Sequence, residues 1–367
     1  MINHSNMKHI LHLEEFVLVP NSVDFIKDVL LSFKDINSMK LSHKMDGAPA
    51  IYFGYHPENG KFFVGTKSIF NSRKEKIFNY SNADIINNYP SYALELKSIL
   101  IQSLKYLEII YPNDGMIYQC DILYTNHLDK EDEGTCISFK PNTVKYIVSK
   151  DDGDHFQRIR ESIFGVAIHT VSKTLNLDDF LPIEDISRFN TNKDVYIDNL
   201  DVKSNEDINT DILVHLIDRL DRMNYSNYKH VYNIDVKLLR QYFNTGIREN
   251  HKAFSFDSLV NFIKNKYETK ISSYKKKETR IKYINILFNI VEELLVNEHH
   301  YRKMLYMYEI LSDFKDIVLS LLVSSNHKYM YCIDGKLSGP EGYVLVHDGI
   351  PIKLVDRYEF SINNFNR

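Results

Sequence analysis

The sequence of 367 residues contains no tryptophan, only three cysteines and no apolar run long enough to cross a bilayer. Cys120, Cys136 and Cys332 form no Cys-x-x-Cys pair, which argues against a disulfide framework and favours a reducing compartment. A transmembrane helix needs about 20 consecutive apolar residues. The first residues also lack the basic and apolar regions of a signal peptide. We therefore expect a cytoplasmic protein with no membrane partner.

A strong excess of either charge is absent as well, because 45 basic and 49 acidic residues give a formal net charge of −4. Such a balance excludes a global electrostatic attraction to nucleic acid, so any such contact must come from local patches. The composition that remains is ordinary for a globular protein, with 44% hydrophobic residues and enough length for one to three domains. Abundant Asn, Ile, Lys and Tyr are typical of an AT-rich viral or bacterial genome.

Apolar spacing predicts an α+β protein whose character changes near residue 172. The first part is expected to hold helices at 21–34 and 91–110 and strands at 51–55, 61–65, 115–124, 135–139, 143–148 and 164–170. Amphipathic helices follow at 208–220, 279–297 and 301–323, before strands resume at 328–332 and 343–356. The predicted division is a first α/β segment 1–172, a helical insertion 173–328 and final strands 329–367.

The segment from Lys44 to Pro49 reads Lys-Met-Asp-Gly-Ala-Pro and precedes a β-prone run. A lysine followed by Asp46 and Gly47 is suited to covalent catalysis. The amine could attack phosphorus, the carboxylate could lie near a nucleotide or its metal, and the glycine would let the backbone approach closely. Taken alone, the same residues also fit a surface turn with a solvated lysine.

Further segments follow in a meaningful order. Lys67 ends the next strand-like run, Asp121 is a single acid inside an apolar strand, and Glu341-Gly342 precedes a strand that is followed by the strand of Lys353. This order resembles motifs I, Ia, III, IV and V of the covalent nucleotidyltransferases, which include ATP-dependent DNA ligases, RNA ligases and capping enzymes. The chain also resembles an uncharacterised phage protein family with a Lys-x-Asp-Gly-Ala-Pro-Ala signature.

The resemblance implies a ligase-type nucleotidyltransferase fold of ATP-grasp-like antiparallel sheets. It makes Lys44 the residue that becomes bonded to the nucleotide. It places Asp46, Gly47, Lys67, Asp121 and Lys353 at the nucleotide, and Glu341 with Asp121 at a divalent metal, Mg²⁺ or Mn²⁺. A free lysine has a pKa of about 10.4, so burial or neighbouring cations must lower that value before the amine can attack.

Several positions depart from the family pattern. Asp121 stands where the family usually has glutamate, and Gln119 stands where a base-stacking aromatic residue is expected. The second motif V lysine is missing, and only 14 residues follow Lys353, too few for the oligonucleotide-binding barrel that carries motif VI in DNA ligases and capping enzymes. RNA ligases more often use helical modules in its place, which favours an RNA-ligase-like enzyme.

The expected activity is that of an ATP-dependent polynucleotide ligase, with GTP as the alternative nucleotide. Its partner would be nucleic acid, RNA with 5′-phosphate and 3′-hydroxyl ends, in repair within the host cytoplasm of a phage. Two alternatives stay open. One is nucleotide transfer to another acceptor, as in a capping-type or protein-modifying enzyme, and the other is a catalytically degenerate nucleotide-binding scaffold in a viral complex.

The loop between the last two strands decides which face each side chain occupies. If His347-Asp348-Gly349 forms a three-residue loop, Glu341 and Lys353 share one face of the sheet, as joint work in one site requires. A two-residue Asp348-Gly349 turn would place them on opposite faces. The expectation is the three-residue loop.

Overall fold

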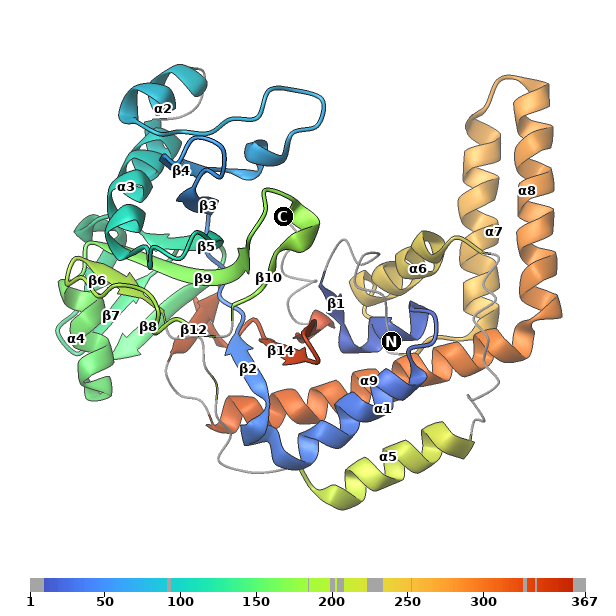
Figure 1. Cartoon of the computed structure of the whole chain (residues 1–367). Coiled ribbons are helices and arrows are strands. Elements are labelled where there is room, and N and C mark those ends of the chain that lie inside the picture. The colour runs from blue at the N-terminus through green and yellow to red at the C-terminus, as the bar shows by residue number, and fades with distance from the viewer. Residues whose placement is uncertain are drawn as a thin grey trace. The chain divides into compact units, whose positions relative to one another are not determined.

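The computed structural model of the chain describes residues 10–90, 94–183, 185–198, 202, 208–222, 234–251, 253–325, 329–333 and 335–358. It is a mixed α+β protein with several antiparallel sheets, which confirms the general class expected (Figure 1). Two compact units are each built from separate stretches of chain. The sheet unit comprises Lys40–Lys203 and Val323–Pro351, and the helical unit comprises Met1–Met39, Ser204–Leu322 and Ile352–Arg367.

These bounds differ from those of the predicted segments. Residues 173–203 stay in the sheet unit because β10 (Leu181–Pro182) and β11 (Val195–Ile197) both pair with β9 (Phe164–Ser172). Residues 10–39 belong to the helical unit, which the sequence did not predict. Within the part of the chain that the structure describes, no helix has the length and apolarity needed to cross a membrane.

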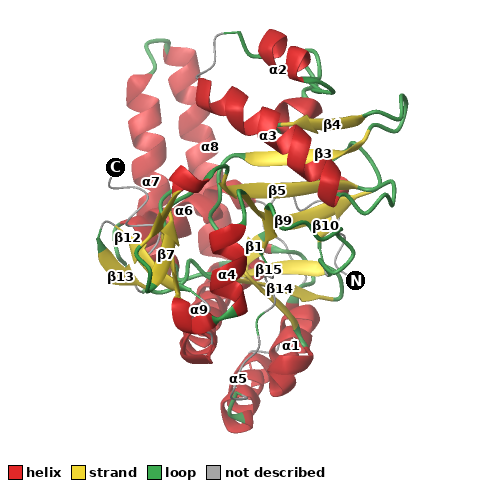
Figure 2. Cartoon of the chain, turned by 90° about the vertical axis from the view of Figure 1, so that its left-hand side faces the viewer, coloured by secondary structure: helices red, strands yellow, loops and turns green. Residues whose placement is uncertain are grey.

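The largest sheet of the sheet unit has the order β10-β9-β5-β3-β4, with β11 added to β9 (Figure 2). Its remaining strands are β3 (Ala50–Tyr55), β4 (Phe62–Gly65) and β5 (Ile117–Tyr124). Alternation along β5 sends Tyr118, Cys120 and Ile122 into one hydrophobic cluster and leaves Gln119 and Asp121 on the other face. The candidate acid therefore faces away from the main core.

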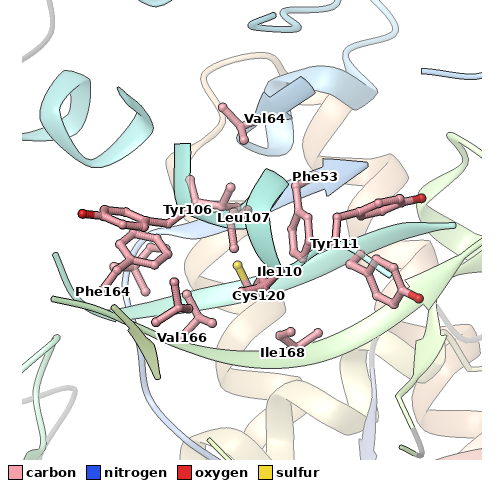
Figure 3. Close-up of a cluster of buried hydrophobic side chains, with 14 of the residues drawn as sticks. Phe53, Val64, Tyr106, Leu107, Ile110, Tyr111, Cys120, Phe164, Val166 and Ile168 are labelled. Atoms are coloured by element: carbon pink, nitrogen blue, oxygen red, sulfur yellow. The ribbon is translucent and has the colours of Figure 1, made fainter. Parts of the chain in front are cut away.

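Helix α3 (Leu94–Ile110) covers the core face of this sheet (Figures 2 and 3). Its Leu107 and Ile110 are fully buried among Phe53, Cys120 and Val166 of three neighbouring strands. The short helix α2 (Asn82–Asn88) precedes it and begins at Ser81, whose hydroxyl accepts a 3.2 Å hydrogen bond from the Asp84 N–H.

A second antiparallel sheet in the sheet unit has the order β13-β12-β8-β7-β6. These strands are β6 (Lys130–Asp132), β7 (Cys136–Phe139), β8 (Lys145–Ser149), β12 (Met330–Ile333) and β13 (Lys336–Ser338). Helix α4 (Asp154–Glu161) follows β8. In the same unit, β2 (Lys40–His43) pairs antiparallel with β14 (Tyr343–His347), so residues about 300 positions apart in sequence become neighbours.

The loop between β3 and β4 turns at Gly60, which has a φ of 66°. The loop predicted between the last two strands differs from the one observed. The connection from β14 to β15 (Ile350–Leu354) contains two residues, Asp348 and Gly349, with φ values of 49° and 74°. Asp-Gly is a favoured pair for a two-residue turn with two left-handed residues, and this preference determines the loop. The predicted three-residue loop is therefore wrong. The shared face of Glu341 and Lys353 was inferred from that loop and is no longer supported.

The helical unit combines N-terminal, central and C-terminal residues. Its helices are α1 (Val23–Ser32), α5 (Thr210–Arg222), α6 (Val236–Arg248), α7 (Phe256–Ser273), α8 (Lys277–Val296) and α9 (Glu298–Ser325), with 3₁₀ turns at Leu13–Leu18 and Phe33–Ser38. The residues Ile26, Val29 and Leu30 bury the predicted apolar face of α1. The strand β1 (Leu11–His12) pairs in parallel with the end of β15, and His12 lies opposite Lys353.

Candidate active site

Lys44 follows directly after β2, where the backbone leaves the strand. Its N–H donates a 2.9 Å hydrogen bond to the carbonyl of Gly342, which extends the pairing between β2 and β14 by one step. The Lys44 ammonium donates to the carboxylate of Glu341 in an ion pair of two half-buried side chains. The structure thus joins the predicted nucleophile to the predicted metal ligand across 297 positions of sequence.

Asp46 is held by two side chains of the second sheet. Its N–H donates a 2.7 Å hydrogen bond to the Tyr146 hydroxyl, and its carboxylate accepts from the Asn142 side-chain amide at 3.1 Å for each oxygen. The pKa of Tyr146 lies well above its usual value. Burial is the main cause of the raised pKa. The hydrogen bond from the Asp46 backbone lowers the pKa, while the charges of Glu341 and Asp46 raise it further. Tyr146 is therefore a neutral phenol that fixes the loop after Lys44.

Gly47 lies directly against strand β5. A Cβ at this position would stand 2.7 Å from the Asp121 Cβ and 2.9 Å from the Ile122 carbonyl oxygen. Backbone bonds on either side keep the two segments together, from the Ala48 N–H to the Ile122 oxygen at 3.0 Å and from the Ile122 N–H to the Pro49 oxygen at 3.2 Å. The close approach that the sequence suggested for this glycine is therefore an approach to Asp121.

Asp121 has a histidine neighbour that the sequence did not reveal. The two residues that pair with it across the sheet are small, Ala50 and Ala167, and its side chain is half-buried. His169 Nε2 lies 3.3 Å from Asp121 Oδ2. A register shift in β9 between the partners of Gln119 and Cys120 makes His169 an extra residue in the pairing. Simple strand alternation could not have placed this imidazole beside the acid.

An aromatic residue does lie next to Gln119, although it comes from another strand. Tyr52 of β3 pairs with Gln119, and its ring packs edge-on against Phe70 at 4.8 Å and Phe180 at 5.4 Å between centroids. Burial, followed by the charge of Asp121, raises the pKa of Tyr52. The face that carries Asp121 therefore has aromatic rings. They do not come from β5, the strand on which a base-stacking aromatic residue was expected.

The two remaining predicted lysines lie on other elements of the structure. Lys67 is exposed at the start of a 3₁₀ turn (Lys67–Phe70), two positions after Gly65, which pairs with Tyr52. Lys353 belongs to the helical unit and is half-buried opposite His12. The structure thus brings together Lys44 with Glu341 and the Asp46-Gly47 pair with Asp121.

A sequence profile described as a family of unknown function, DUF6267, matches residues 6–367, almost the whole chain. The chain belongs to DUF6267. Neither the curated proteins nor the solved structures contain a match.

The acids of this DUF6267 chain are spread over the site rather than gathered at one point. Among the described residues, no group of three or more His, Cys, Asp or Glu side chains is placed to hold a metal ion. Mg²⁺ is usually bound through one or two carboxylates together with substrate phosphates, so a dedicated protein cage is not required. Glu341 and Asp121 suit that pattern as single carboxylates on separate segments.

A pocket of about 500 Å³ opens beside the Lys44 loop in the sheet unit. Ala48 forms part of its wall, together with Thr125 and Asn126 after β5 and with Lys140 and Lys145 around β8. Lys44, Asp121 and Glu341 are not among its lining residues. The candidate site is therefore defined by the Lys44–Glu341 ion pair and by the backbone contacts of the Lys44 loop with β5. The pocket adjoins this loop at Ala48.

Proposed function

We propose that this DUF6267 protein is an ATP-dependent polynucleotide ligase of RNA-ligase type that works through a lysyl-AMP intermediate. The ligase-type nucleotidyltransferase fold is part of the proposal, and the antiparallel sheets around the Lys44 loop support it. The observation that carries the proposal is the ion pair of Lys44 with Glu341. Two short motifs from opposite ends of the sequence meet at one amine, which a surface turn with a solvated lysine does not explain.

In the first step, the Lys44 amine attacks the α-phosphorus of ATP. A nitrogen–phosphorus bond forms, and the bond from that phosphorus to the bridging oxygen breaks as pyrophosphate leaves. Lys44 must first lose a proton, and the Glu341 carboxylate already accepts a hydrogen bond from its ammonium group. This ion pair positions the amine but favours its charged form, so the contact must break and the proton must pass to solvent before the attack. AMP then passes to a 5′-phosphate end, and a 3′-hydroxyl displaces it.

The residues present are compatible with Mg²⁺ held by few protein ligands. Glu341 and Asp121 are the carboxylates assigned to it, with phosphate oxygens completing the shell. When bound, the ion would neutralise part of the triphosphate charge. Asp46 and Gly47 keep the Lys44 loop against β5, which positions the amine relative to Asp121. Within the sheet unit, Lys67 is the cation assigned to the phosphates.

Transfer of label from α-labelled ATP to the protein tests this proposal directly. In the presence of Mg²⁺, wild type is expected to retain label on a denaturing gel, and Lys44→Ala and Lys44→Arg are expected to retain none. Lys61→Ala, at an exposed position in the β3–β4 loop, is the matched control and should keep the wild-type amount. Glu341→Gln should lower the rate of labelling by about 10–100-fold, because it removes one of the two carboxylates assigned to the metal.

The nucleotide and the acceptor separate the ligase from other enzymes of this chemistry. Labelling by GTP in preference to ATP would contradict the ligase and favour a capping-type activity. With ATP, a 5′-phosphorylated RNA should collect the AMP and then be sealed to a 3′-hydroxyl end. Label on Lys44→Ala, or no label with either nucleotide and either Mg²⁺ or Mn²⁺, would overturn the covalent mechanism.

A further inference from the structure

Helix α8 has an apolar face that packs within its own hairpin. It runs antiparallel to α7 in the helical unit (Figure 1). Leu294 of α8 is fully buried. Tyr283 stacks on Tyr274 at 4.9 Å between ring centroids, and the Lys270 ammonium of α7 lies 4.3 Å from the Tyr283 ring centre. These contacts account for one side of α8.

A second apolar face of α8 points to solvent. Ile281, Ile284, Phe288 and Leu295 are 48%, 50%, 66% and 57% exposed, and Val291 on the same line is half-buried. We call these five residues the α8 stripe. Their spacing of three, four, three and four residues is the repeat of a coiled-coil seam. When a helix is apolar on two sides, both sides are normally buried against other parts of the protein or against a partner. A contiguous exposed apolar surface therefore marks an interaction site.

The charges beside the α8 stripe indicate what covers it. Lys277 and Arg280 lie beside the stripe at its N-terminal end, while Glu292 lies beside it at its C-terminal end. A second α8 in the antiparallel direction would bring each basic end against an acidic end. A parallel copy would bring like charges together, which is unfavourable.

The two ends of the stripe lie at equal distances from its middle. Phe288, its most exposed member, lies seven residues from both Ile281 and Leu295. An antiparallel pair can therefore place a two-fold axis near Phe288 and match the apolar residues on either side. Such an interface uses the same patch on both copies and closes after two subunits.

We propose that two copies of this protein associate through their α8 stripes, antiparallel, around a two-fold axis near Phe288. The helix has 20 residues and is thus about 30 Å long. A seam of this length is short for a coiled coil, so the dimer is in reversible exchange with the monomer. The inference does not depend on the proposed ligase activity.

Sedimentation velocity on the full chain over a wide concentration range tests the association. Wild type should shift from monomer to dimer as concentration rises, and Phe288→Glu should weaken the dimer by at least about 100-fold, as expected for a central anchor. Ile86→Glu is the matched control, because Ile86 is an exposed apolar residue of α2. It should dimerise as wild type does. A wild type that stays monomeric throughout, or a dimer unaffected by Phe288→Glu, would overturn the proposal.

Cysteine cross-linking with a short bismaleimide tests the direction. Phe288→Cys should cross-link to itself, because it lies near the axis. Ile281→Cys should not, yet it should cross-link in a mixture with Leu295→Cys. Wild type supplies the background from its own cysteines. Efficient self-cross-linking of Ile281→Cys would indicate a parallel pair and would contradict the antiparallel interface.

Discussion

Gly47 sets the distance between the Lys44 loop and strand β5. The atoms that a side chain would meet belong to the Asp121 Cβ and to the Ile122 backbone, neither of which can rotate away. The backbone hydrogen bonds of Ala48 and Pro49 to Ile122 fix the same approach from the next residues. One added methyl group would therefore push the loop from the strand, and with it both Asp46 and Lys44.

Gly47→Ala should destabilise the protein by about 1–3 kcal/mol, the usual cost of inserting a group into a filled space. Urea unfolding measures this change, and nucleotide labelling should fall more than the folded fraction does. Gly339→Ala is the control, because a Cβ there meets no atom within 4 Å and its backbone is not left-handed. Equal stability of the two variants would contradict the close approach.

At the scale of residues, the sequence predicted part of the site. Lys44 and Glu341 were expected in one site and form an ion pair, and Gly47 was expected at a close backbone approach and lies against β5. His169 could not be predicted, since its place beside Asp121 depends on a register shift in β9 that no local pattern signals. Whether these residues act on a nucleotide stays a prediction.

At the scale of elements, a buried ionic group ties the N-terminal 3₁₀ turn to α9. Glu14 and Lys315 are 1% and 2% exposed, and their charged atoms are 2.7 Å apart. Arg357 Nη1 lies 3.5 Å from the same Glu14 oxygen and 2.9 Å from the Tyr308 hydroxyl. Burial alone would raise the pKa of Glu14, but the charge of Lys315, with further help from Arg357, lowers it to about 2.

Lys315→Met should cost about 3–5 kcal/mol of unfolding free energy, because it leaves the Glu14 carboxylate buried without its nearest cation. Chemical denaturation at pH 7 measures the loss. Arg302→Met is the matched control on the same helix, since Arg302 is exposed and its ion pair with Glu298 is worth about 1 kcal/mol or less. Similar losses in both variants would show that the buried pair has no special role.

The same pair predicts how stability depends on pH. The pKa of Glu14 falls from an ordinary 4.5 to about 2 on folding. Its contribution, roughly 3 kcal/mol, is therefore complete above pH 4.5 and is lost as the pH falls toward 2. Lys315→Met should show a smaller acid-dependent loss than wild type over that interval.

Elements with strong periodicity were predicted well. The helices at 279–297 and 301–323 correspond to α8 and α9, and the strand at 115–124 corresponds to β5. The short strands β10 and β11 were not predicted, because two or three residues carry no readable alternation. The predicted β14–β15 loop was wrong, because the local preference of Asp348-Gly349 for a two-residue turn determines the connection.

At the scale of the whole molecule, the chain passes between its two units several times. The sheet unit and the helical unit are each assembled from segments that are distant in sequence. The predicted helical insertion anticipated an interrupted sheet domain, but it did not assign residues 10–39 or the segment from Ile352 to the helical part. The Lys44–Glu341 pair belongs to the sheet unit, whereas the Glu14–Lys315 pair belongs to the helical unit. Substitutions at these two ion pairs can therefore test each unit separately.

Scanning calorimetry can exploit this separation, because proteins with more than one unit often unfold in more than one transition. ATP with Mg²⁺ at 100 times its dissociation constant should stabilise the nucleotide-binding unit by about 2.7 kcal/mol. We expect that gain in the transition of the sheet unit, and we expect Lys315→Met to lower the transition of the helical unit. A nucleotide that shifts only the transition lowered by Lys315→Met would place its binding site in the helical unit and contradict the site at Lys44.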